Sequence, residues 1–399
     1  MSVLIFKILY MKNKFFKSIF PSILLTLPIG SVYAFSLFSS DIANAINCSF
    51  KEIQFAFSLS IFFLGMGAAF GGSLVEKNIT KSSLLATILF SIGLICTSIG
   101  ISISNIWLIY LGYGCLCGIA QGIGYLTPVK TLIMWFPNNK GLASAISIIS
   151  FGLGSSLCTI LHKLLSPICG INHIFYALAA IYFVMMFIGS CIIRKPYREH
   201  EAVSNSTPFN YKTIFKDKFF ICAWLFMFLN ISAGLALIGS SVNIFKSYNL
   251  SAGHIVFFMM LAGLFNGLFR LVFACMADFF DGCRLNVWVI ITGLSILLMC
   301  FSYALPWLIV PSIILINACY GGGFSTLPSV LSEEYDLTCL SRVHGLVLSA
   351  WGVAGLIGNN ISSLLYSYTG NFMILPLILL AMYIINFILT MSMMKIPRS

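Results

Sequence analysis

The sequence predicts an all-α membrane protein with 12 transmembrane helices in two six-helix, pseudo-symmetric bundles. Hydrophobic residues make up 59% of the 399 residues and charged residues only 8%, whereas about a quarter of a soluble domain is charged. About twenty apolar residues span a bilayer, and twelve such stretches follow one another along the chain. These stretches lack the alternation of lipid-facing β-strands, so helices are needed to satisfy their backbone in lipid.

The predicted spans fall into two groups of six around one long polar stretch. That stretch, 194–218, carries Pro196, Pro208 and several charges, and every other connection is short. We therefore predict an N-terminal six-helix bundle over 1–193, a cytoplasmic linker loop over 194–218 and a C-terminal six-helix bundle over 219–399. The spans centre near residues 28, 64, 93, 116, 152, 183, 230, 266, 294, 317, 355 and 383.

Three short patterns of the first half recur in the same order about 200 residues later, which indicates an internal duplication. The pairs are Gly72–Glu76 with Ala274–Asp278, Gly124–Pro128 with Gly323–Pro328, and Lys140–Leu142 with His344–Leu346. Repeated halves of this kind build transporters that hold their substrate near the bilayer midplane between the repeats.

The net charge of +11 indicates membrane sidedness and not a nucleic-acid partner. With the N-terminus in the cytoplasm, all but four of the 22 Lys and Arg lie on the cytoplasmic side, as the positive-inside rule requires. The exceptions are Lys51, Lys163 and Lys246 outside and Arg270 within the membrane. We expect a multi-pass protein of a bacterial inner (cell) membrane, with both termini cytoplasmic.

The fourth span and the segment after it, 113–154, carry the most specific pattern. Gly114, Gly118 and Gly122 recur every four residues, which permits close contact with a neighbouring helix. Pro128 is expected to end or kink this helix. Gln121, in the same span, is an uncharged polar residue at membrane depth, and so are Asn230 and Asn266. Each of them either forms hydrogen bonds between helices or lines a pocket. His162, His173, His254 and His344 are expected at the membrane interface.

Arg270 is predicted to be the only charged side chain deep inside an apolar segment, and no Asp or Glu lies within these segments to pair with it. Such a charge costs roughly 2.5–3.5 kcal/mol at a helix centre on insertion scales. A cation that faces a wet cavity and binds an anionic substrate would account for it. The alternative is that Arg270, eight residues before Asp278, reaches the cytoplasmic interface with its long stem.

Five sequence blocks in order resemble the oxalate/formate antiporter family of the major facilitator superfamily. They are Gly30 to Phe38, Gly124-Tyr125 through Ala143 with its Trp-Phe-Pro stretch, Asn266 to Arg270, Tyr320 to Pro328, and His344 to Gly352. The resemblance implies the major facilitator fold and a secondary transporter that works by alternating access, with Arg270 binding a substrate carboxylate. It also implies a cavity lined by Tyr33, Tyr125, Tyr320, Phe324 and Trp351, to which Asn266 and Gln121 are added as polar candidates.

One departure from that family bears on the substrate. Oxalate-transporting relatives carry a lysine on the eleventh span, where this chain has Ala350-Trp351-Gly352. One arginine balances one carboxylate, whereas a dianion would leave net charge in a cavity of low dielectric constant. We therefore expect a monocarboxylate such as formate, pyruvate or lactate, moved by exchange or uniport. An oxalate-type dicarboxylate or a proton-coupled metabolite is the alternative.

The loop after the second span resembles the superfamily's loop signature and is predicted to be a conformational latch. An acid near a helix N-terminus or a basic side chain can lock one state, and a small residue before it allows close helix contact. The predicted latch residues are Gly72, Glu76, Lys77 and Lys81 in the first half and Asp278 and Arg284 in the second.

Two other classes of function fit the sequence less well than a carrier does. A membrane-embedded enzyme needs clustered acids, histidines or an activated nucleophile at membrane depth, which the sequence does not suggest. A non-transporting sensor would normally carry a larger soluble domain. The 13 cysteines show no C-x-x-C spacing, so no metal or cofactor is expected. The expected partners are a small organic anion and the lipid bilayer, with a monomeric state.

Overall fold

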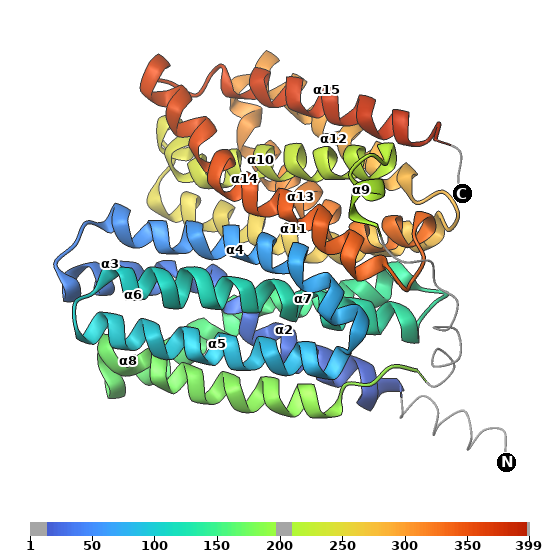
Figure 1. Cartoon of the computed structure of the whole chain (residues 1–399). Coiled ribbons are helices and arrows are strands. Elements are labelled where there is room, and N and C mark those ends of the chain that lie inside the picture. Colours follow the sequence, from blue (N-terminus) through green and yellow to red (C-terminus); the bar gives the residue numbers. More distant parts are fainter. Residues whose placement is uncertain (1–13, 197–209, 397–399) are drawn as a thin grey trace, which may run out of the picture. The chain divides into compact units, whose positions relative to one another are not determined.

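The computed structural model describes residues 14–196 and 210–396, and these ranges contain helices and no strand (Figure 1). Within them, eleven helices are long and apolar enough to cross a membrane. One of these, α8 (Lys140–Ile192), has 53 residues and would be about 80 Å long if straight, against a bilayer core of about 30 Å. Its backbone leaves helical geometry at Gly170, where φ is 64°, so α8 supplies two spans and the twelve predicted spans are confirmed.

The chain divides into two compact units. The first comprises Met1–Phe209 and Asp336–Ser349, and the second comprises Asn210–Tyr335 and Ala350–Ser399. Besides α8, the first unit contains η1 (Phe15–Ile19), α2 (Phe20–Ile29), η2 (Gly30–Ala34), α3 (Ser36–Ile46), α4 (Phe50–Lys77), α5 (Ile79–Ser102), α6 (Ile106–Ile109), η3 (Tyr110–Cys117) and α7 (Gly118–Trp135). The second contains α9 (Tyr211–Ile214), α10 (Lys218–Ser247), α11 (Ala252–Phe279), α12 (Leu285–Ala304), η6 (Pro306–Leu308), α13 (Ile309–Glu334) and α15 (Leu375–Met393).

Helix α14 (Leu340–Thr369) belongs to both units, because its first ten residues group with the first unit and the rest with the second. The sequence placed residues 336–349 in the C-terminal bundle, so their contacts with the first unit were not anticipated. Of the predicted linker 194–218, residues 197–209 lie outside the described residues. The boundaries predicted for the two bundles, 1–193 and 219–399, stay a prediction.

Side-chain caps fix where several helices begin. The Ser49 hydroxyl accepts from the Glu52 backbone N–H, and the Glu52 carboxylate accepts from the Ser49 N–H in return, which is a capping box at the start of α4. Asn78, Asp217 and Ser251 cap α5, α10 and α11 in the same general way. These short polar residues stand just before apolar runs, so the sequence marks the helix starts locally.

Glycine allows the helices of the first unit to approach closely. The predicted small face of the fourth span is confirmed, because Gly114, Gly118 and Gly122 all face α4. A Cβ atom at Gly118 would lie 2.7 Å from the Ser60 carbonyl oxygen, so a larger residue would push the two helices apart. Pro128 was expected to end or kink this helix. It does not end the helix, since α7 continues to Trp135.

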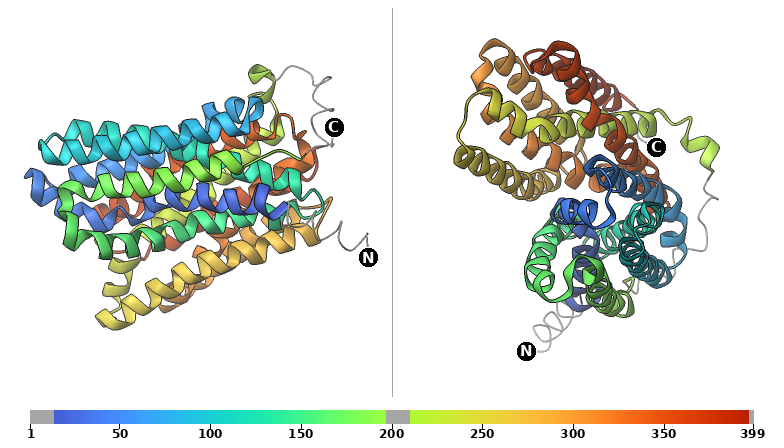
Figure 2. Two further views of the ribbon diagram at one scale, coloured as in Figure 1. Left: turned by 90° about the horizontal axis from the view of Figure 1, so that it is seen from below. Right: turned by 90° about the vertical axis from the view of Figure 1, so that its left-hand side faces the viewer.

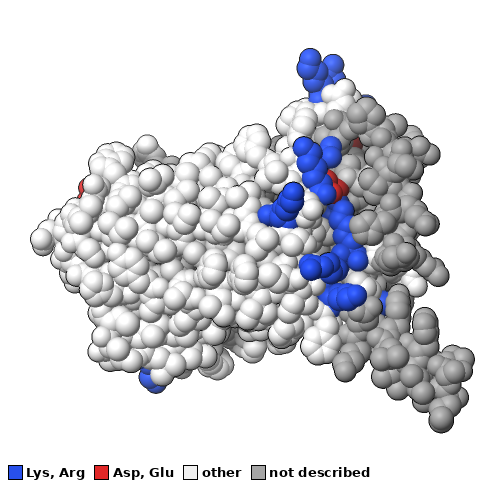
Figure 3. Space-filling view, turned by 60° about the horizontal axis from the view of Figure 1, so that its bottom comes forward, with Lys and Arg blue, Asp and Glu red and all other residues white. Residues whose placement is uncertain are grey.

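Two further views show the helices of each unit from the side and closer to end-on (Figure 2). On the face drawn in Figure 3, Lys and Arg gather toward one end of the helices and leave a long wall almost without charge. A wall of this kind suits contact with lipid tails, and a basic end suits the cytoplasmic surface that the sequence predicts.

Candidate functional site

Arg270 lies on α11 and is buried, with 6% of its surface exposed. Its Nε donates a hydrogen bond of 3.1 Å to Oδ1 of Asn266, one turn earlier on the same helix. The Asn266 amide in turn donates, at 3.1 Å, to the backbone carbonyl of Asn317 on α13. Asn266 therefore links Arg270 to the neighbouring helix and fixes the direction of its stem along α11.

The glycine run after Tyr320 makes room for this arrangement. α11 packs along α13, and a Cβ atom at Gly321 would lie 2.5 Å from the Asn266 carbonyl oxygen and 3.1 Å from Cγ of Arg270. At Gly323, a Cβ atom would lie 2.5 Å from Nδ2 of Asn230 on α10. The run lets α13 approach α11 on one side and α10 on the other, and only residues without a side chain allow both contacts.

A group of three aromatic rings begins next to the guanidinium. Its Cζ lies 6.0 Å from the centre of the Phe324 ring, at the outer limit of a cation–π contact. Phe324 packs edge-on against Tyr320 at 5.2 Å and against Trp351 at 4.6 Å between ring centres. The structure thus brings five predicted site residues of the second unit together: Arg270, Asn266, Tyr320, Phe324 and Trp351.

The predicted site residues of the first unit form a separate aromatic group. Phe151 on α8 lies between Tyr33 and Tyr125, with ring centres 5.6 and 5.7 Å away. Phe151 was not among the predicted residues, because it stands in an unremarkable apolar run. Gln121 is fully buried and lies one turn from Tyr125 on α7, and its Oε1 accepts a 3.4 Å hydrogen bond from Ser60 on α4. Gln121 therefore makes the interhelical contact that was one of its two expected roles.

His344, expected at the membrane interface, is buried among the helices of the first unit. Only 2% of its surface is exposed, and its ring packs against Tyr125 with 5.9 Å between centres. The neighbouring Gly345 meets Ala68 and Leu126 so closely that the start of α14 is held against α4 and α7. A position near the end of an apolar segment did not predict burial, because burial here comes from tertiary packing.

Asn230 is fully buried on α10, and in the described residues neither atom of its amide has a hydrogen-bond partner. A buried polar group without a partner costs about 1–3 kcal/mol. Asn230→Leu keeps the branched shape and removes this cost, so we expect a higher thermal unfolding midpoint in detergent. Asn386→Leu is the control, because the Asn386 amide donates to the Phe226 carbonyl at 3.1 Å. A lower midpoint for Asn230→Leu than for wild type would contradict the prediction.

Glu76 joins two helices at the end of α4. Its carboxylate forms a buried ion pair with Lys130 of α7 and accepts a 2.7 Å hydrogen bond from the backbone N–H of Ser341 at the start of α14. At Gly72, one turn earlier, a Cβ atom would lie 2.6 Å from Cα of Arg342, so the predicted need for a small residue is confirmed. Lys77 and Lys81, the cations predicted for this latch, are exposed.

Lys130 is a second buried cation on a membrane-spanning helix, near the end of that helix, and its burial was not predicted. It lies inside α7 with 4% of its side chain exposed, and Glu76 is its counter-ion. The sequence feature that pointed to a buried cation is a lysine two residues after Pro128, within a mostly apolar run. We call Glu76, Lys130 and Ser341 the Glu76 cluster.

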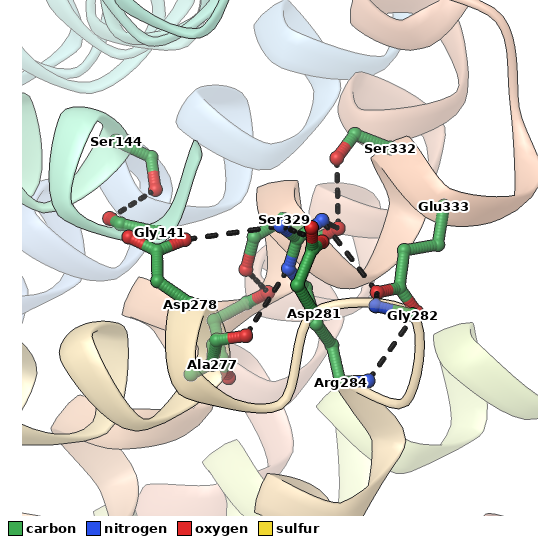
Figure 4. A network of polar contacts seen from close by, with 11 residues as sticks. Gly141, Ser144, Ala277, Asp278, Asp281, Gly282, Arg284, Ser329, Ser332 and Glu333 are labelled. Atoms are coloured by element: carbon green, nitrogen blue, oxygen red, sulfur yellow. Dashed lines mark hydrogen bonds and ion pairs between the residues drawn. The ribbon is translucent and has the colours of Figure 1, made fainter. Parts of the chain in front are cut away.

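The second predicted latch pair, Asp278 and Arg284, is part of a larger network (Figure 4). Arg284 is 1% exposed, and its guanidinium lies 3.9 Å from Asp278, 2.5 Å from Asp281 and 3.6 Å from Glu333. It also donates to the backbone carbonyls of Ala277 and Ser329. The Glu333 carboxylate accepts from the backbone N–H groups of Gly282 and Arg284, which orders the turn between α11 and α12.

Comparison with known proteins places these features in a family context. The model of the Major Facilitator Superfamily matches residues 20–359. The uncharacterised MFS-type transporter YhjX of Escherichia coli is 26% identical over 340 residues, which cover 82% of each chain. The oxalate:formate antiporter of Oxalobacter formigenes is 22% identical over 361 residues, covering 88% of this chain and 84% of that protein. A bacterial homologue of the iron transporter ferroportin shares the fold, with a TM-score of 0.74 at 12% identity over 94% of this chain and 99% of that one.

Proposed function

Because this chain belongs to the Major Facilitator Superfamily, we propose that it moves a small organic anion across a membrane by alternating access, and that the substrate is a monocarboxylate. The observation that carries this proposal is Arg270, a buried guanidinium on a membrane-spanning helix, oriented by Asn266 and bordered by Phe324. Guanidinium keeps its charge in a protein and can grip a carboxylate through two parallel hydrogen bonds. The Phe324 ring beside it, with Tyr320 and Trp351 packed against that ring, offers an apolar wall for the rest of a small acid.

Charge matching favours one carboxylate over two. Arg270 is the one cation among the eight predicted substrate residues, and Trp351 occupies the region where oxalate-transporting relatives are expected to carry a lysine. The similar protein of Oxalobacter formigenes is named for two carboxylates, oxalate and formate. One carboxylate matches the one cation among these residues, whereas a dicarboxylate would bring one more negative charge. Exchange of one anion for another and uniport are both compatible with this site.

The proposed location is a bacterial inner membrane with cytoplasmic termini. The basic residues near one end of the helices support this orientation. Reporter fusions at the two termini would test it, and an active periplasmic reporter at either end would reject it.

The proposed substrate class is tested with the purified wild-type protein. Thermal unfolding is followed with formate, acetate, pyruvate, lactate, oxalate and malonate, and labelled ligands that stabilise the protein are then used in proteoliposome uptake. We expect stabilisation by monocarboxylates and faster uptake when the vesicles are preloaded with a second monocarboxylate. Uptake of none of these acids, with folded protein in the vesicles, would reject the proposal.

Trp351→Lys tests the charge-matching argument. Trp351 packs on Phe324, which borders Arg270, so a lysine there adds a second cation to the same group of residues. We expect oxalate to compete for uptake at least tenfold better in this variant, relative to formate, than in wild type. Trp351→Leu is the control for lost ring packing. Unchanged or weaker competition by oxalate in Trp351→Lys would count against charge matching.

We further propose that the Glu76 cluster latches one state of the transport cycle by holding the start of α14 to α4 and α7. Cys339 reports on it, because burial, with smaller contributions from the carboxylates of Glu76 and Asp336, raises the pKa of this thiol. Maleimide reacts with the thiolate, so labelling of Cys339 should need a higher pH than an ordinary thiol. In Glu76→Gln one of these carboxylates is gone and the packing is weaker, so labelling should speed up several-fold at pH 7.5.

The measurement is peptide mass spectrometry after timed labelling between pH 6.5 and 9.5. Cys283, which is exposed, serves as the internal control. A Glu76→Gln profile for Cys339 that overlies the wild-type profile would show that Glu76 does not hold this segment.

A further inference from the structure

Two glycines share a helix face with Arg270. Gly263, Gly267 and Arg270 stand at positions i, i+4 and i+7 of α11, which places them in one row. Asn266, on one flank of this row, bonds to α13, so Gly267 lies on the flank turned away from α13. Gly263 and Gly267 are exposed, and a Cβ atom at either would meet no heavy atom of the described residues within 4 Å. The row next to Arg270 is therefore open.

No helix packing in the described structure accounts for glycine at these two positions. At Gly321 and Gly323 an added Cβ would strike a neighbouring helix 2.5 Å away, and glycine is required there. At Gly267 neither a neighbour nor a positive φ requires it. A glycine inside a helix costs about 1 kcal/mol relative to alanine. A sequence that accepts this cost twice beside a buried guanidinium gains open space next to that group.

Resting on the proposed function, we propose that Gly267, with Gly263 beyond it, determines substrate size by accommodating the group attached to the carboxyl carbon. The carboxylate binds at Arg270, and the attached group lies along the row toward the start of α11. The surface left by glycine is backbone without a side chain, and the carbonyls there are used in helix hydrogen bonds. The substrate group that fits is therefore short and apolar, which favours monocarboxylates of two to four carbons over formate.

The test is competitive uptake in proteoliposomes with the series formate, acetate, propionate and butyrate. In wild type we expect the affinity of the competing acid to rise about fourfold for each added carbon up to propionate. Burying one methylene group gives a gain in affinity of about this size. In Gly267→Leu the side chain fills the row, so the ratio of propionate to formate affinity should fall at least tenfold. Gly267→Ala should give a smaller change in the same direction and covers the case in which the leucine variant does not fold.

Gly293→Leu is the matched control, because it lies on α12 of the same unit and an added Cβ there also meets nothing within 4 Å. It should leave the series unchanged. Equal loss of all four acids in folded Gly267→Leu, or no change at all, would overturn the size assignment while leaving the carrier proposal intact. If wild type transports none of the acids, the proposed function itself fails and the assignment fails with it.

Discussion

Arg270→Gln is expected to abolish monocarboxylate uptake, with at least a hundredfold loss of substrate affinity. A hydrogen bond to a charged group contributes about 1.5–3 kcal/mol, and a bidentate carboxylate loses two of them together with the charge attraction. Glutamine retains a polar head close to Asn266, so the α11–α13 contact is largely preserved. Affinity is measured by ligand-dependent thermal shift and transport by uptake of labelled substrate.

Arg270→Lys separates charge from geometry. Lysine keeps the charge but loses the planar fork, so we expect an affinity between those of wild type and Arg270→Gln. Equal amounts of folded protein in the vesicles, checked by size-exclusion chromatography, make the uptake rates comparable. Uptake at the wild-type rate by Arg270→Gln would remove Arg270 from the substrate site, although the membership of the superfamily would stand.

Arg284→Met is expected to have the largest effect on stability. Arg284 is almost fully buried among Asp278, Asp281 and Glu333, and removing it leaves Asp278 and Glu333 buried without this cation. Removing one partner of a buried ion pair destabilises a protein by about 3–5 kcal/mol. We therefore expect a marked fall in the thermal unfolding midpoint in detergent and a lower yield of folded protein.

Asp281→Asn provides the contrast within the same network. The Asp281 side chain is 69% exposed, and exposed ion pairs contribute little, about 0–1 kcal/mol. The thermal unfolding midpoint of Asp281→Asn should stay close to that of wild type. A midpoint for Arg284→Met as high as that for Asp281→Asn would mean that the network does not stabilise the turn between α11 and α12.

Residues of the candidate site were predictable where their type is unusual for a membrane-spanning segment. A cation in an apolar run pointed to Arg270, and the glycine run after Tyr320 pointed to a close helix contact, which the structure places against Arg270 itself. Phe151 was missed because one phenylalanine among 36 gives no signal. Lys130 gave a signal, yet a lysine near a span end is common, and only the position of Glu76 on another helix shows that it is buried and paired.

The sequence by itself determined the class of the protein and its twelve spans. These follow from composition and local pattern, because a helix in lipid must satisfy its own backbone and expose an apolar surface. Tertiary structure alone decided that residues 336–349 pack with the first unit, that His344 is buried and that Glu76 pairs with Lys130. Each of these depends on contacts between residues far apart along the chain, whose closeness no local pattern encodes.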